Sequence, residues 1–334
     1  MVVVALSGSG ILVATSATPG AAAAGGCPGS AYVPNYLDGT VSVINTATGA
    51  VSAPIAFSKG PGAGVVAITP DGKHAYVTNP LGGTVSVITT ATGVVSAPIT
   101  VGKMPIGLAI TPDGKHVYVT NNNDDTVSVI TTATGVVSAP ITVGKGSDWV
   151  AITPDGKRAY VTNNNDDTVS VITTATGAVS APIAVGKRPS TVAITPDGKH
   201  AYVTNYTDGT VSVITTATGA VSAPITVGNS PVAVAITPDG KHAYVTNEGH
   251  LGAGDSDTVS VITTATGAVA PITVGKGPDA VAITPDGKRA YVTNNNDGTV
   301  SVITTATGAV SAPIKVGTVP YAVAICPTRS AHRR

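Results

Sequence analysis

The sequence predicts an all-β fold, a seven-bladed β-propeller built from four-stranded antiparallel blades. Val, Thr, Ile, Gly and Pro dominate the 334 residues, and glutamate occurs once, which is the composition of strands and turns. The string Thr-Pro-Asp-Gly-Lys recurs six times between Thr69 and Thr284, at spacings of 42 residues and once 47. Tyr-Val-x-Asn and Thr-Val-Ser-Val-Ile each occur seven times. A period of about 40 residues with four short strands per repeat is typical of propeller blades.

One repeat illustrates the expected order of elements. The first strand, residues 150–153, ends at a Pro-Asp-Gly turn, and residues 159–162 form the second strand of a hairpin. A polar loop leads to the third strand, residues 168–173. The fourth, residues 179–185, contains Pro182, which cannot donate a ladder hydrogen bond, so we expect this strand at the outer edge.

These three motifs resemble the YVTN-family β-propeller repeat over residues 27–327, with Ile-Thr-Thr-Ala-Thr where that family often has Ile-Asp-Thr-Ala-Thr. The Gly-His and Trp-Asp marks of WD40 repeats are missing. The resemblance implies a propeller of the kind found in archaeal surface layers and in exported bacterial proteins.

Three regions are predicted along the chain. Residues 1–26 are apolar and end in an Ala-rich stretch typical of a signal peptide, although no Lys or Arg precedes the apolar run. Residues 27–328 form the propeller, and 329–334 a short basic tail. No other stretch is long enough to cross a membrane, so we expect a secreted or cell-envelope protein (periplasm or cell surface) with no integral span once the signal is cleaved.

The first and last segments together complete one blade. Residues 322–327 align with the inner strand of the other repeats, which the first repeat lacks, so the C-terminus should supply the inner strand of a composite blade. Cys27 and Cys326 then fall on either side of one turn, which predicts a disulfide in an oxidising compartment. Two buried thiols, or a lipid-modified Cys27, are the alternatives.

Differences between the repeats concentrate on one face. The loops that lead into each inner strand, and those that join second to third strands, should surround one end of the central channel; we call this the channel mouth. Ligands commonly bind in such concave places. The predicted ligand-binding residues there are Asp148, Trp149, Arg188, Asp279, Tyr321, Tyr36, Tyr206, Glu248 and His250. Ordinary drift in surface loops is the competing interpretation.

The sequence gives little indication of a metal or cofactor site. Asp124-Asp125 and Asp166-Asp167 offer oxygen ligands but lack calcium-loop spacing, so neither a metal nor another cofactor is predicted. His74, His116, His200 and His242 recur just after Thr-Pro-Asp-Gly-Lys, alternating with Arg158 and Arg289, and we interpret them as a solvated surface.

We hypothesise a non-enzymatic propeller, expected to be monomeric, that binds a protein, glycan or small ligand at the channel mouth. The alternatives are a hydrolase or lactonase that uses a channel-bound metal, which would rest on fold analogy, and a passive surface-layer protein. The 18 basic residues cancel the 18 acidic ones, and no basic stripe marks a nucleic-acid surface.

Overall fold

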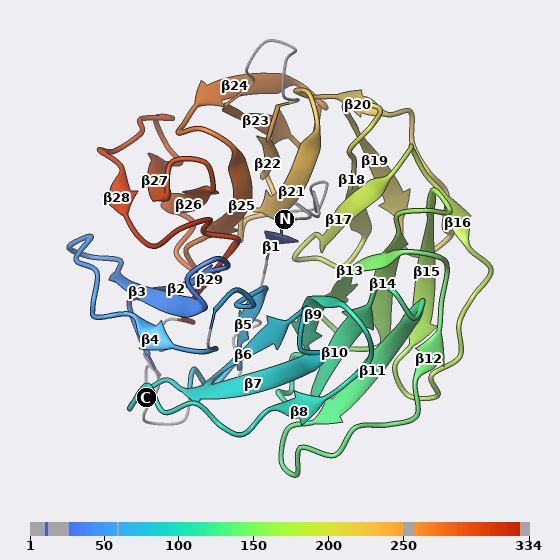
Figure 1. Cartoon of the computed structure of the whole chain (residues 1–334). Coiled ribbons are helices and arrows are strands. Elements are labelled where there is room, and N and C mark those ends of the chain that lie inside the picture. Colours follow the sequence, from blue (N-terminus) through green and yellow to red (C-terminus); the bar gives the residue numbers. More distant parts are fainter. Residues whose placement is uncertain (1–10, 13–26, 59, 250–256, 328–334) are drawn as a thin grey trace, which may run out of the picture.

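The computed structural model describes residues 11–12, 27–58, 60–249 and 257–327 and confirms the seven-bladed propeller. Seven sheets stand around a central axis (Figure 1). Six of them have four antiparallel strands, and the seventh has five. Each inner strand contacts the inner strands of the neighbouring blades, including β25 with β29 and β29 with β5, so the ring closes.

The strands fall into four classes by their distance from the channel. The inner strands are β5 (Val66–Ile68), β9 (Pro105–Ile110), β13 (Ser147–Ile152), β17 (Pro189–Ile194), β21 (Pro231–Ile236), β25 (Pro278–Ile283) and β29 (Ala322–Ile325). The second strands are β2 (Ser30–Asn35), β6 (His74–Asn79), β10 (His116–Asn121), β14 (Arg158–Asn163), β18 (His200–Asn205), β22 (His242–Asn247) and β26 (Arg289–Asn294). The third strands are β3 (Thr40–Asn45), β7 (Thr84–Thr89), β11 (Thr126–Thr131), β15 (Thr168–Thr173), β19 (Thr210–Thr215), β23 (Thr258–Thr263) and β27 (Thr299–Thr304). The outer strands are β4 (Ile55–Ala56), β8 (Ile99–Thr100), β12 (Ile141–Thr142), β16 (Ile183–Ala184), β20 (Ile225–Thr226), β24 (Val269–Thr273) and β28 (Ile314–Lys315).

The outer strands are shorter than predicted. Residues 179–185 were expected to form one strand, but β16 covers two of them, and Val179 makes an isolated bridge to Ile172. Between the two pairings, the backbone N–H of Ser180 donates to the carbonyl of Val171 at 2.9 Å, and the ladder is interrupted at Ala181 and the donor-less Pro182. One blade lacks the equivalent serine, and there β24 pairs continuously with β23 through Pro271.

The composite blade and the predicted disulfide are both confirmed. β29 pairs with β2 in the register Ala31 to Ile325, and Cys27 is bonded to Cys326 with Cα atoms 5.8 Å apart. No free cysteine remains, so the alternatives of two thiols and a lipid-modified Cys27 are wrong. A disulfide is compatible with an exported protein.

A further short strand, β1 (Ile11–Leu12), pairs in parallel with β29 and lies at the centre of the ring in Figure 1. The rest of the predicted signal peptide and the basic tail lie outside the described residues. Within the described ranges, no helix is long and apolar enough to cross a membrane.

The Asn that ends each Tyr-Val-x-Asn motif is a structural residue. Asn121 is fully buried; its amide nitrogen donates to the hydroxyls of Thr126 and Ser128, and its carbonyl accepts the backbone N–H of Gly102 at 2.9 Å. A Cβ on Gly102 would lie 2.5 Å from the Asn121 side chain, so this close approach requires glycine. In this blade the Asn therefore locks the second strand to the third strand and to the connection that leads into the inner strand.

The threonine before that Asn binds the next blade. Thr120 Oγ1 donates to the carbonyl of Asp148 on β13, and Thr246 Oγ1 donates to the carbonyl of Asp279 on β25, both at 2.7 Å. Five blades hold the inner strand of the following blade in this way, through Thr78, Thr120, Thr162, Thr204 and Thr246.

Candidate functional site

Asp279 is a buried ionisable group of the channel mouth. It is the second residue of β25 and 2% exposed. Its carboxylate accepts one hydrogen bond, from Asn295 Nδ2 at 3.4 Å. Burial, followed by the nearby charge of Glu248, raises the pKa of this carboxyl well above its usual value, against a smaller lowering by Asn295. A carboxyl group in such a site retains its proton at a pH where exposed carboxyls are ionised.

Residues from four blades lie at or act on the Tyr321 phenol. Burial raises the pKa of its phenol well above 10.0, and the charges of Asp279, Asp148 and Glu248 add to that rise in decreasing order. Its ring lies 5.9 Å from that of Tyr36, tilted by 42°. These side chains act on one phenol although they are spread over the whole chain, so the propeller brings them together.

Arg188 and Tyr206 form the adjoining part of the mouth. The Arg188 guanidinium lies 4.9 Å from the centre of the Tyr206 ring, a cation–π distance. Burial raises the pKa of Tyr206, the charge of Glu248 raises it further, and a hydrogen bond with Ser230 and the charge of Arg188 lower it. Glu248 therefore acts on both halves of the mouth.

The backbone that enters the inner strands is strained at several blades. Met104, Arg188, Ser230 and Val319 have φ between 51° and 55°, in the left-handed region that side chains with a Cβ rarely adopt. The blades that carry Asp148 and Asp279 have Gly146 and Gly277 at this register. Because the same φ recurs at this register from blade to blade, the turn into the inner strand imposes it, and glycine meets it without strain.

The remaining predicted residues have different surroundings. Asp148 is 2% exposed at the start of β13. Trp149 is 3% exposed and belongs to the hydrophobic core, where a Cβ on Gly107 would meet its ring at 3.0 Å. Contact between Trp149 and a ligand thus remains a prediction, and the burial of its side chain indicates packing between blades. His250 lies outside the described residues.

Two residues of the channel mouth were not predicted from the sequence. Asn295 and Ser230 look like ordinary loop residues, and their hydrogen bonds to Asp279 and Tyr206 become evident from the ring geometry. Their positions were the available sequence signal: Ser230 directly precedes an inner strand, and Asn295 directly follows a second strand.

No metal centre emerges from the described part of the chain. In residues 11–12, 27–58, 60–249 and 257–327, no group of three His, Cys, Asp or Glu side chains has the geometry to hold an ion. The aspartates of the first pair accept backbone hydrogen bonds. Asp124 accepts one from the N–H of Lys103 at 2.8 Å, and Asp125 accepts one from the N–H of Gly146 at 2.7 Å. These two carboxylates therefore hold the connections that lead into the inner strands.

Comparisons with known proteins agree with the fold. A family model described as a seven-bladed lactonase β-propeller matches residues 29–139, and one for YNCE-like β-propellers matches residues 150–255. No curated protein matches the chain.

Solved structures give long superpositions at low identity. Hydrazine synthase of Kuenenia stuttgartiensis is 25% identical with a TM-score of 0.72, over 78% of this chain and 89% of that one. The periplasmic gluconolactonase of Pseudomonas aeruginosa is 20% identical with a TM-score of 0.71, over 88% and 98%. A putative 6-phosphogluconolactonase from Bacteroides uniformis is 19% identical with a TM-score of 0.72, over 88% and 98%. The specific YVTN and surface-layer resemblance stays a prediction, and the chain is a seven-bladed β-propeller with segments that match the lactonase and YNCE-like models.

Proposed function

We propose that the protein hydrolyses a lactone at the channel mouth by acid–base chemistry of its own side chains. The observation that carries the proposal is the buried carboxyl of Asp279, whose pKa is raised by burial and by the charge of Glu248 and whose own charge acts on the Tyr321 phenol. Two coupled carboxyl groups in different surroundings are typical of acid–base pairs. The partial match to a lactonase model and the similarity to structures named as lactonases support this reaction over binding without turnover.

Each side chain has a distinct role in the proposed reaction. Glu248, half-buried, acts as general base and takes a proton from water as the water oxygen bonds to the lactone carbonyl carbon. The protonated Asp279 and the Tyr321 hydroxyl donate hydrogen bonds to the oxyanion that forms. The carbon–oxygen bond of the ring then breaks, and the leaving oxygen takes the proton from Glu248, which yields one hydroxy acid.

The charges of the mouth favour a neutral substrate. Asp148, Asp279 and Glu248 all act on Tyr321, and the Arg188 guanidinium is already stacked on Tyr206. An anionic group near these carboxyls would raise their pKa further and be repelled by any that ionise. We therefore expect a neutral hydroxylated lactone to be a better substrate than its phosphorylated form. The disulfide supports action outside the cytoplasm.

The test measures hydrolysis of glucono-1,5-lactone, its 6-phosphate and simple γ- and δ-lactones by acid release, corrected for the spontaneous reaction. Glu248→Gln and Asp279→Asn should each lower kcat at least about 100-fold, and Tyr321→Phe about 10-fold or more. Asp155→Asn, in a turn at the opposite end of the channel, is the matched control and should keep the wild-type rate.

Absence of hydrolysis by the wild-type protein on every lactone would overturn the proposal. Saturable lactone binding without turnover, lost in Asp279→Asn, would instead favour a binding propeller. Equal rates in wild type, Glu248→Gln and Asp279→Asn would show that catalysis takes place elsewhere.

A further inference from the structure

A recurring pocket lies between neighbouring blades at the end of the channel opposite the mouth. The three clearest, which we call seam pockets, contain His74, His116 and His200 and have volumes of about 770, 670 and 550 Å³. Each is lined by the Thr-Pro-Asp turn, the His and the Tyr of one blade and by the Asp-Gly and Thr-Ala-Thr-Gly turns of the next. His74, His116 and His200 thus line these surface pockets.

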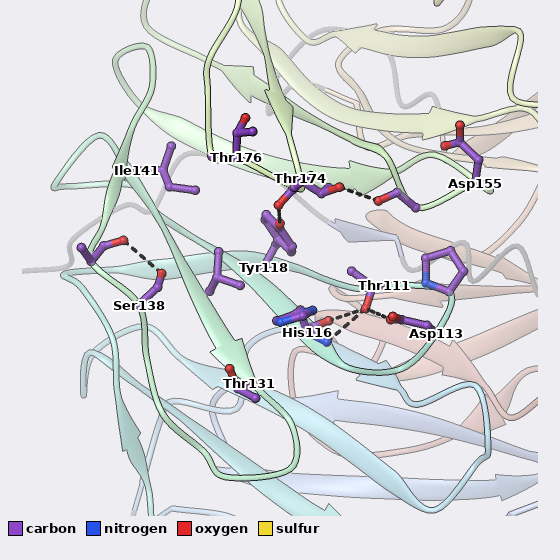
Figure 2. A pocket seen from close by; sticks show the side chains of 16 residues that line it. Thr111, Asp113, His116, Tyr118, Thr131, Ser138, Ile141, Asp155, Thr174 and Thr176 are labelled. Carbon is purple, nitrogen blue, oxygen red and sulfur yellow. Dashed lines mark hydrogen bonds between the residues drawn. The ribbon is translucent and has the colours of Figure 1, made fainter.

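The His116 pocket shows the polar groups in detail (Figure 2). Tyr118 Oη reaches across the seam to the carbonyl of Thr174 on the next blade, at the long distance of 3.5 Å. The backbone N–H of His116 donates to Thr111 Oγ1, and that hydroxyl donates to Asp113 Oδ1. Among the described residues no hydrogen bond to the imidazole ring is found, so the ring lines the cavity without spanning it.

Two other blades place arginine at the histidine register. Arg158 Nη1 donates to the carbonyl of Thr216 at 2.5 Å, and the hydroxyl of Tyr160 reaches the same oxygen at 3.4 Å. Arg289 Nη1 likewise donates to the carbonyl of Thr46, beside the Tyr291 hydroxyl. The chain therefore seats a guanidinium group at the seam in these blades, on the carbonyl that corresponds to that of Thr174.

The charges in the seam pockets at His74, His116 and His200 also suit a guanidinium group. Burial raises the pKa of Asp113, but hydrogen bonds from Thr111 and the Lys115 backbone, with the charges of Lys115 and His116, lower it more, so the carboxylate is ionised at neutral pH. Its ion pair with Lys115, at 3.8 Å, is exposed and weak. Asp155, from the next blade, also lines the pocket, and the Thr153 hydroxyl is the main cause of its lowered pKa.

We infer that the seam pockets at His74, His116 and His200 bind guanidinium groups, seated as Arg158 and Arg289 are seated in their own blades. The planar group donates to the carbonyl of the facing Thr-Thr-Ala-Thr turn and lies beside an ionised aspartate. Three such pockets on one end of the ring would engage an arginine-rich polypeptide by several contacts at once, which raises the overall affinity. This site is independent of the proposed lactone chemistry.

The chain provides its own variants for the test. In a triple variant with His74→Arg, His116→Arg and His200→Arg, the new guanidinium groups should occupy the three pockets. In a double variant with Arg158→His and Arg289→His, two more pockets should open. Both changes reproduce arrangements already present in other blades, so we expect the variants to fold, as a thermal melt would verify. Methylguanidinium is titrated against the protein and followed by the imidazole carbon–proton NMR signals.

We expect saturable shifts of the His74, His116 and His200 signals, and two additional shifting signals in the Arg-to-His variant. Methylammonium, a point charge without a planar fork, should bind at least tenfold more weakly. A labelled peptide with spaced arginines distinguishes a polypeptide ligand from a free guanidinium compound: it should bind tighter than methylguanidinium and lose at least tenfold in affinity to the triple His-to-Arg variant.

Unchanged imidazole signals in methylguanidinium, or equal peptide binding by wild type and the triple variant, would overturn the inference. Binding of a monosaccharide in these pockets without binding of methylguanidinium would also overturn it. If the arginine peptide binds no tighter than methylguanidinium, the pockets bind small guanidinium compounds and not a polypeptide.

Discussion

Reduction of the Cys27–Cys326 disulfide should lower the thermal stability of the propeller by several degrees. The bond joins residues separated by 299 positions and lies beside the pairing of β2 with β29 that closes the ring. Without it, the same strands still pair, so the native blade persists. The principal change is therefore the larger freedom of the unfolded chain.

The magnitude follows from the length of the closed loop. For a loop of this size, the chain-entropy relation gives about 19 cal/mol/K, or about 5.7 kcal/mol at 25 °C. Unfolding entropies near 2.1 cal/mol/K per residue over about 300 residues then predict a decrease in Tm of about 9 °C.

The assay is a thermal melt with and without reductant, with alkylation and mass measurement to verify complete reduction. The double variant Cys27→Ser, Cys326→Ser should melt near the reduced protein and should not respond to reductant, which controls for other effects of the reagent. A fully reduced protein that melts within about 2 °C of the oxidised one would refute the loop-entropy reasoning and indicate that strand pairing alone holds the ring.

Three further variants test other parts of the structure. In wild type, the raised pKa of Asp279 makes the free energy of unfolding fall as pH rises from about 4 to that pKa, by up to about 1.4 kcal/mol per pH unit. Asp279→Asn should remove this slope in denaturant melts between pH 4 and 8; an unchanged slope would contradict the buried carboxyl. In Gly144→Ala, the new Cβ would lie 2.5 Å from the Asn163 side chain, so we expect a loss of about 2 kcal/mol, and a wild-type urea midpoint would argue against this packing. Val319→Asn should stabilise by about 1 kcal/mol, because asparagine tolerates the left-handed φ of 54° better than a β-branched residue, and a lower Tm would show that the valine side chain contributes more than its strain.

Much of the fold could be predicted because each blade is specified locally. The Pro-Asp-Gly turns, alternating strands and edge proline of one repeat define a four-stranded unit, and seven copies close a ring. The missing inner strand of the first repeat predicted the composite blade, and the blade in turn placed Cys27 beside Cys326. The outer strands were overestimated, because periodicity does not show where the ladder to the third strand is interrupted, as it is at residues 181–182.

The sequence by itself therefore determined the blades, their number, the ring closure and the disulfide, since these follow from short-range turn chemistry and repetition. Only the tertiary structure decided which of the variable residues act together. The curvature of the ring brings Asp279 and Glu248 close enough to raise the pKa of Tyr321, buries Trp149 in the core, and places His74, His116 and His200 in pockets beside the turns of the next blade. Such proximities depend on the packing of all seven blades around one axis, and no single repeat encodes that geometry.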